Sequence, residues 1–332
     1  MEQRKRIIAI VAGGDSSEHD VSMRSAQGIY SFMDKETYDC YIIEIRGTEW
    51  NAVMEDGKRC RVDKNDFSFE TAKGTVKPDF AYITIHGTPG ENGILQGYFD
   101  LIRLPYSTSG VLVEALTFNK FNLNQYLKTW GVKVAESLLL RKGKEANVTD
   151  EEIIEKVGLP CFVKPNADGS SFGVNKVKTQ EQLRPAIKMA MDEGNETIVE
   201  SFMQGTEITC GCYKTRRGSH VFPITEVVSD DEFFDYNAKY NGAVKEITPA
   251  RIADETAQRV KQLTSAIYDI LGCEGIIRID YILTGEKGKE KINMLEINTT
   301  PGMTATSFIP QQVRAAGLEM GDVLADIIEN KF

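Results

Sequence analysis

The 332-residue sequence lacks the features of a secreted, membrane-bound or disulfide-bonded protein. Its six cysteines include no Cys-x-x-Cys pair, and the apolar run at residues 7–12 is too short for a signal-sequence core or a membrane span. Cys210 and Cys212 lie two residues apart in an expected strand, where packing on one face explains them better than a zinc site without further ligands. We therefore expect reduced thiols, a cytoplasmic protein and no membrane partner.

Basic residues are outnumbered by acidic ones. There are 39 Lys and Arg against 49 Asp and Glu, which gives a formal net charge of -10. A surface of this sign repels a polyanion, so nucleic acid is not an expected partner. Apolar residues make up 41% and no low-complexity tract is present, so the length predicts a folded chain of two or three domains.

Two common catalytic motifs are absent or out of context. No Gly-x-x-x-x-Gly-Lys-Ser/Thr occurs, which excludes a P-loop. Residues 169–173 fit the Gly-x-Ser-x-Gly pattern of α/β-hydrolases, but residues 174–177 alternate like a strand where that motif requires a helix. A triad would also need a histidine downstream, and His220 is the only one. A hydrolase is therefore disfavoured.

Strand and helix patterns alternate along the chain and predict an α/β fold. Capping-box pairs, Thr149 with Glu152 and Thr179 with Gln182, mark the start of two helices. The expected strands are residues 7–12, 41–45, 80–85, 161–164, 173–177, 208–213, 275–283 and 292–298.

Polar side chains stand inside two of these apolar strands. Arg278 and Asp280 share one face of the first strand, and Glu296 and Asn298 share one face of the second. If the strands pair as a hairpin, three oxygen ligands gather beside one guanidinium, as suits Mg²⁺ bridging nucleotide phosphates. The alternative is a surface hairpin with an Arg–Asp pair.

Residues 163–174 form a second candidate site. Lys164 ends an expected strand, and the small residues that follow include the hydroxyls of Ser170 and Ser171. Such a loop can cover a polyphosphate with hydrogen-bond donors. A plain hairpin turn is the alternative.

Seven segments in this order resemble those of D-alanine–D-alanine ligases, which belong to the ATP-grasp superfamily. They are residues 13–22, 86–97, 105–110, 163–173, 234–240, 278–280 and 295–304. The resemblance implies a mixed α/β, three-domain ATP-grasp fold. Its parts would be a Rossmann-like, substrate-binding N-terminal domain (1–118), a small central ATP-grasp domain (119–204) and a C-terminal domain with a metal site (205–332).

The implied reaction joins two D-alanine molecules through an acyl phosphate, releases ADP and phosphate, and supplies peptidoglycan synthesis in a cytoplasmic homodimer. ATP would lie between the central and C-terminal domains, with adenine at residues 200–203 and the ribose at Glu207. The implied ATP-binding residues are Lys120, Lys164, Ser171, Glu200, Ser201, Phe202, Met203, Glu207 and Lys239. Asp280, Glu296 and Asn298 would hold two Mg²⁺ or Mn²⁺ ions.

The resemblance also implies an amino-acid site. Asp20 would bind the ammonium of the first D-alanine, in a hydrogen-bonded set with Ser170 and Tyr240. Arg278 and the Gly302 N–H would stabilise the oxyanion. The other implied substrate contacts are His86, Phe308 and Ser307, the last holding the carboxylate of the second D-alanine.

Three departures from the family pattern stand out: Asn92 and Asn119 replace a common aspartate, and Ser201 replaces a frequent lysine. Two alternatives to the main hypothesis stay open. The second substrate could be D-lactate or D-serine, although Lys239-Tyr240 resembles the form that positions an amine. The chain could also be an inactive sensor of ATP or amino acids, although its complete set of expected metal ligands argues against this.

Overall fold

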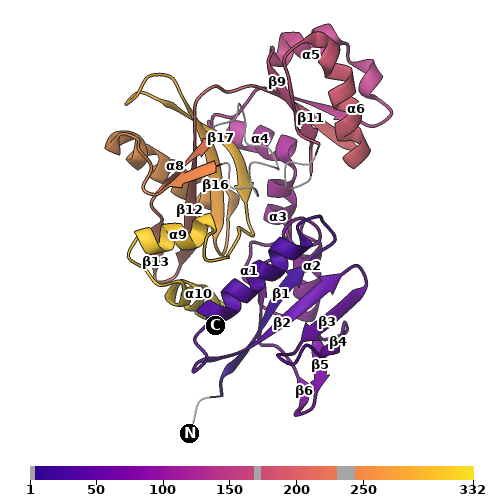
Figure 1. Ribbon diagram of the computed structural model, residues 1–332, viewed down its shortest axis with the longest axis vertical. Helices are drawn as coiled ribbons and strands as arrows, with labels where there is room; N and C mark the ends of the chain where they lie inside the picture. The colour runs from indigo at the N-terminus through magenta and orange to yellow at the C-terminus, as the bar shows by residue number, and fades with distance from the viewer. Residues whose placement is uncertain (1–3, 168–172, 230–243) are drawn as a thin grey trace.

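The computed structural model describes residues 4–167, 173–229 and 244–332, and three sheets organise them (Figure 1). The first sheet has the strand order β6-β5-β4-β3-β2-β1-β7, and β1 runs parallel to both β2 and β7. Its strands are β1 (Arg6–Gly13), β2 (Tyr38–Arg46), β3 (Glu49–Val53), β4 (Arg59–Asp63), β5 (Ser68–Thr71), β6 (Gly74–Val76) and β7 (Phe80–Ile83). Its helices are α1 (His19–Phe32) and α2 (Ile94–Ile102).

The second sheet is small and antiparallel, with the order β10-β9-β11-β8. Its elements are β8 (Ser137–Arg141), α5 (Asp150–Val157), β9 (Cys161–Pro165), β10 (Asn175–Val177), α6 (Leu183–Glu193) and β11 (Glu196–Ser201). The helices α3 (Val111–Phe118) and α4 (Lys120–Thr129) connect it to the first sheet. Thr149 begins α5 with the expected capping box, so this helix start is confirmed.

The third sheet has the order β15-β14-β12-β16-β17, with β13 paired to β12. Its strands are β12 (Thr206–Thr215), β13 (Gly218–Val221), β14 (Thr225–Ser229), β15 (Val244–Ile247), β16 (Ile277–Thr284) and β17 (Lys291–Asn298). Its helices are α8 (Asp254–Leu271), α9 (Phe308–Ala315) and α10 (Met320–Glu329). The two strands expected to carry the metal ligands, at residues 275–283 and 292–298, are therefore present as β16 and β17, and they are neighbours in this sheet.

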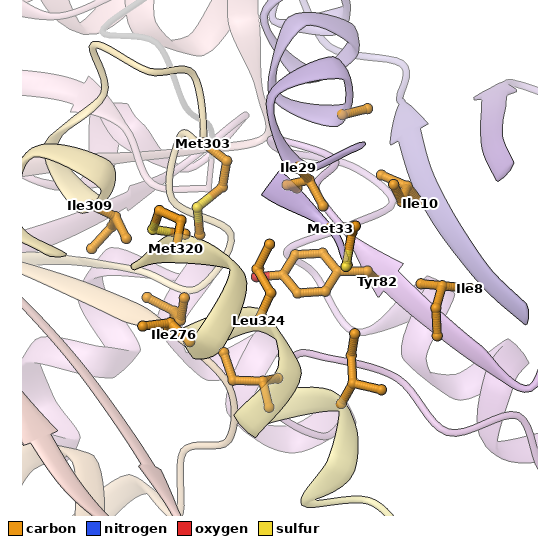
Figure 2. Packing of buried hydrophobic residues seen from close by; sticks show 14 of the residues in the cluster. Ile8, Ile10, Ile29, Met33, Tyr82, Ile276, Met303, Ile309, Met320 and Leu324 are labelled. Carbon is orange, nitrogen blue, oxygen red and sulfur yellow. The ribbon is translucent and has the colours of Figure 1, made fainter. Parts of the chain in front are cut away.

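The C-terminal helices return to the first sheet and share its core. Figure 2 shows Leu324 of α10 beside Tyr82 of β7, and Met320 of α10 near Met303; all four side chains are buried in one cluster. Burying one such side chain contributes about 1.5–3 kcal/mol. Packing thus joins the two ends of the chain, whereas the expected boundaries at residues 118 and 204 remain predictions. In the described residues, no helix is long and apolar enough to cross a membrane.

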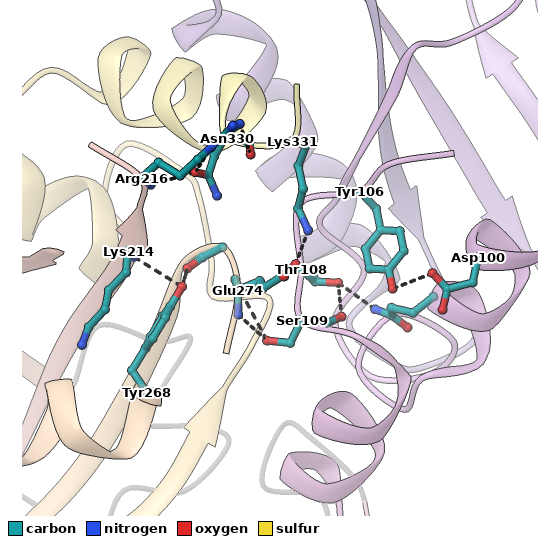
Figure 3. Close-up of polar contacts among 12 residues, drawn as sticks. Asp100, Tyr106, Thr108, Ser109, Lys214, Arg216, Tyr268, Glu274, Asn330 and Lys331 are labelled. Carbon is teal, nitrogen blue, oxygen red and sulfur yellow. Dashed lines mark hydrogen bonds and ion pairs between the residues drawn. The ribbon is translucent and has the colours of Figure 1, made fainter. Parts of the chain in front are cut away.

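The loop between α8 and β16 also contacts the segment that precedes α3. Ser109 Oγ accepts from the Glu274 N–H at 3.0 Å, next to Thr108 and Lys331 (Figure 3). The following residue, Gly275, has φ +68°, and a Cβ atom there would lie 1.9 Å from the Ser107 carbonyl oxygen. Only a residue without a side chain fits this approach.

We expect Gly275→Ala to destabilise the fold much more than Gly272→Ala. Both positions are left-handed (φ +68° and +67°), but a Cβ at Gly272 meets nothing within 4 Å. The shared conformational cost is about 1–2 kcal/mol, and the overlap at Gly275 adds about 1–3 kcal/mol. Urea unfolding of the two variants measures the difference, and equal losses would contradict the close approach.

Candidate active site

The hairpin β16–β17 carries the first group of expected site residues. Antiparallel pairing places Arg278 opposite Asn298 and Asp280 opposite Glu296, with a register shift directly after Asp280. The predicted hairpin is therefore confirmed. Because strand side chains alternate, all four side chains project to the same face.

The Asp280 carboxylate is the centre of this group and is 7% exposed. Arg278 donates from Nε to Oδ1 and from Nη2 to Oδ2, both at 2.9 Å, and Asn298 Nδ2 donates to Oδ2 at 3.1 Å. Burial opposes the guanidinium charge, but Asp280, Glu296 and Glu91 outweigh it and raise the pKa of Arg278. Arg278 is thus a fixed cation within a bidentate pair.

A second cation, which is buried, comes from the second sheet. Lys164, on β9, has Nζ 2.5 Å from Glu200 Oε2, and Asn124 Nδ2 donates to the other oxygen at 2.9 Å. Burial opposes the ammonium charge, but Glu200 and, at longer range, Glu296 of the hairpin outweigh it and raise the pKa of Lys164. The lysine therefore stays charged, and it lines the same cavity as Glu296 of β17.

One cavity of about 1330 Å³ contains both groups. It is bounded by the second and third sheets, the start of α1 and the segment that leads into α9. The expected site residues that line it are His86, Lys120, Lys164, Glu200, Ser201, Phe202, Met203, Glu207, Arg278, Asp280, Glu296, Asn298, Gly302, Ser307 and Phe308. Residues more than 200 positions apart in the sequence thus meet in one place.

The end of the cavity near α9 is shaped by a compact turn. Ser307 Oγ accepts from the Thr304 N–H at 3.1 Å, and Phe308 begins α9. The Arg278 guanidinium lies 5.2 Å from the centre of the Phe308 ring. This end therefore combines the hydroxyls of Thr304, Thr306 and Ser307 with one cation and an apolar wall.

Asp20 is the expected residue that the structure does not bring to the cavity. It is the second residue of α1, its side chain is 91% exposed, and its contact is His19 Nδ1 at 3.1 Å. The helix turns it toward solvent, whereas Glu18, two residues earlier, lines the cavity. The prediction of Asp20 is corrected accordingly. Ser170, Ser171, Lys239 and Tyr240 lie outside the described residues.

Several residues of the cavity wall were not predicted: Glu18, Arg24, Glu91 and Lys176. Lys176 lies with Nζ 4.0 Å from the centre of the Phe202 ring, beside the segment expected to meet adenine. The alternation of Val174 and Lys176, which both line the cavity, is the sequence signal that could have identified it. Ser201 Oγ accepts a hydrogen bond of 3.1 Å from the N–H of Glu136, the residue that precedes β8.

Two family models cover most of the chain. The D-ala D-ala ligase N-terminus matches residues 7–109, and the D-ala D-ala ligase C-terminus matches residues 126–329. The chain belongs to the D-alanine–D-alanine ligase family. Proteins named D-alanine–D-alanine ligase are 68% identical in Phocaeicola vulgatus and 66% identical in Bacteroides fragilis, each over 99% of this chain and 100% of the relative.

Solved structures agree with this membership of the D-alanine–D-alanine ligase family. The VanG D-Ala:D-Ser ligase of Enterococcus faecalis superposes with a TM-score of 0.87 at 29% identity, covering 99% of this chain and 100% of that one. D-alanine–D-alanine ligase from Bacillus anthracis, solved in complex with ATP, gives 0.76 at 26% identity, covering 98% and 97%. The expected ATP-grasp fold is thus confirmed, and use of ATP and of small-molecule substrates goes with the family.

Proposed function

We propose that the chain joins two D-alanine molecules into D-alanyl-D-alanine and converts ATP to ADP and phosphate. The observation that carries this proposal is that two cations, Arg278 of the hairpin and Lys164 of the second sheet, line one cavity together with Asp280 and Glu296. The names of the close relatives support D-alanine as the substrate. The product would enter peptidoglycan synthesis.

Asp280, Glu296 and Asn298 would hold Mg²⁺ or Mn²⁺, two ions in the expected arrangement. The donor set fits, because two carboxylates and one amide oxygen line the same cavity and leave positions for phosphate oxygens and water. When bound, the ions would neutralise charge on the transferred phosphoryl group.

The nucleotide would lie between the second and third sheets. We propose that residues 200–203 meet adenine, Glu207 the ribose, and Lys120 and Lys164 the phosphates; Ser171 and Lys239 keep the roles expected from the family. Phe162 and Phe202, with ring centres 5.9 Å apart, supply an apolar wall on the adenine side.

The chain's own groups would then act on two successive steps. The carboxylate oxygen of the first D-alanine attacks the γ-phosphorus, ADP leaves, and an acyl phosphate forms. The amine of the second attacks the acyl carbon, loses a proton, and expels phosphate. Arg278 and the Gly302 N–H would stabilise the oxyanion that forms when the amine adds to the acyl carbon, before phosphate leaves. Ser307 would hold the carboxylate of the second D-alanine.

We expect Glu18, and not Asp20, to bind the ammonium of the first D-alanine. Glu18→Gln removes a charge that lines the cavity, whereas Asp20→Asn removes one from an exposed side chain. The first variant should raise the KM for the first D-alanine by about 10-fold or more, as expected for a lost charge-assisted contact. The second should change it less than about 2-fold, because an exposed pair contributes little. The reverse order of effects would restore the Asp20 prediction.

The direct test is the reaction itself. Purified protein with ATP and Mg²⁺ should release phosphate when D-alanine is added, and the dipeptide should be the main product by mass spectrometry. Addition of D-lactate or D-serine beside D-alanine tests the alternative acceptors, and a depsipeptide or D-alanyl-D-serine as main product would overturn our choice. No D-alanine-dependent phosphate release would favour the sensor.

We further propose that the enzyme acts in the cytoplasm as a homodimer. All six cysteines are free, which fits a reducing compartment. Leu101 on α2 and Leu112 on α3 are 84% and 78% exposed, and these helices neighbour one another, so they offer an apolar surface for a second copy. Light scattering would measure the mass.

A further inference from the structure

A buried carboxyl lies directly behind the proposed site and has no role in the steps above. Glu114, on α3, is 0% exposed and does not line the cavity. Its Oε2 accepts a hydrogen bond of 2.5 Å from the hydroxyl of Thr299. Thr299 is the residue that follows Asn298, one of the proposed metal ligands.

Not every acceptor oxygen around this carboxyl has a donor within hydrogen-bond distance. Glu114 Oε1 and Gln96 Oε1 are both buried without a hydrogen-bond partner among the described residues. Gln96 uses its Nε2 on Gly90 O and Thr108 Oγ1, at 2.6 and 3.0 Å. Burial and the nearby Glu91 raise the pKa of Glu114 well above its usual value. A neutral carboxyl, with its own O–H donor, therefore suits this environment better than a charge.

The segment that Glu114 contacts is fixed at several points. Thr300 donates from Oγ1 to Ile85 O at 2.9 Å, and the Met303 N–H donates to Ser25 Oγ at 3.3 Å. Between these lie Pro301 and Gly302, whose N–H is the proposed oxyanion donor. Among these contacts, the one between Glu114 and Thr299 is the nearest in sequence to Asn298, and it lies where β17 ends.

We propose that Glu114 is a positioning residue that holds Thr299 and thereby places Asn298 for the metal and Gly302 for the oxyanion. The proposal rests on the proposed function. An acceptor oxygen is needed because α3 must accept a hydrogen bond from the Thr299 hydroxyl where both side chains are buried. A glutamine keeps the acceptor oxygen and the shape, whereas an alanine removes both.

The test compares Glu114→Gln, Glu114→Ala, Thr299→Val and the double variant Glu114→Ala/Thr299→Val. Residues that orient metal ligands typically change affinity or rate by about 10–100-fold. We expect Glu114→Ala to lower kcat by about 10-fold or more, with the KM for D-alanine within about 2-fold. Glu114→Gln should keep at least half of the wild-type kcat, and the double variant should be no slower than the slower single variant.

Mn²⁺ binding in the presence of ADP, followed by electron paramagnetic resonance, gives a second measurement that needs no turnover. Its dissociation constant should rise for Glu114→Ala and stay unchanged for Glu114→Gln. A wild type that binds Mn²⁺ and ADP but forms no dipeptide would defeat the proposed function and leave this comparison valid.

Two outcomes would overturn the positioning role. One is a Glu114→Ala variant with wild-type kcat and Mn²⁺ affinity, even if its melting temperature is lower. The other is strictly additive losses in the double variant, which would mean that Glu114 and Thr299 act independently. If Glu114→Ala does not fold, Thr299→Val and Glu114→Gln decide the question by the same measurements.

Discussion

Replacing Arg278 with methionine is expected to lower kcat by about 10²–10³-fold, the usual loss when one oxyanion donor is removed. The guanidinium is the only side chain expected to meet the tetrahedral oxyanion, and its position is set by the bidentate pair with Asp280. Methionine keeps most of the side-chain volume but removes both the charge and the donors. Steady-state phosphate release at saturating D-alanine measures the effect.

The variant Arg278→Lys separates charge from geometry. Lysine keeps a cation but cannot donate to both Asp280 oxygens from one plane, so we expect it to recover only part of the lost rate. Arg217, an exposed arginine paired with Asp326 at 2.7 Å, provides the matched control, and Arg217→Met should leave kcat unchanged. An Arg278→Met variant with kcat within about 3-fold of wild type would remove this residue from the mechanism.

The hairpin of the site was predictable from the sequence because two simple rules determine it. Strand alternation assigns Arg278 and Asp280 to one face, and the short connection to β17 makes antiparallel pairing the natural outcome. The position of Lys164 opposite that hairpin was not available from these rules. It depends on how the second sheet packs against the third, and only the family resemblance supplied it.

Asp20 is the residue expected from the resemblance that the structure places away from the cavity. The segment around it was matched correctly, but the choice between Glu18 and Asp20 depends on where α1 begins and which of its faces is buried. The helix begins at His19, so neighbouring acidic residues point in different directions. A carboxylate next to the start of a helix cannot be assigned to a site until the first residue of the helix, and so the direction of each side chain, is known.

The strands β3 to β6 and the residue Glu114 were missed for different reasons. Those strands are short and carry charged, exposed residues such as Arg59 and Arg61, so they have little apolar signal. Glu114 is a charged residue in a helix of mostly apolar residues, so the sequence alone predicts that its side chain is exposed. Its burial results from contact with the β17 turn, a tertiary effect that overrides local pattern.

Replacing Lys164 with methionine should impair both folding and catalysis. It removes the cation beside the Glu200 carboxylate, which is buried and keeps the hydrogen bond from Asn124 Nδ2. Breaking a buried ion pair on one side costs about 3–5 kcal/mol. It also removes a cation expected at the transferred phosphoryl group, so kcat should fall by about 10²-fold or more. Lys156, about half exposed and 3.4 Å from Glu136, gives the control: Lys156→Met should change stability by at most about 1 kcal/mol.

The double variant Lys164→Met/Glu200→Gln distinguishes the two effects. Removing both charges takes away the unpaired carboxylate, so urea unfolding should show most of the lost stability restored. The rate should stay low, because no cation replaces the lysine beside Glu296 and the phosphates. If the double variant regained the wild-type kcat, Lys164 would be needed only to neutralise Glu200, and the phosphoryl group would have to be stabilised by other residues of the cavity.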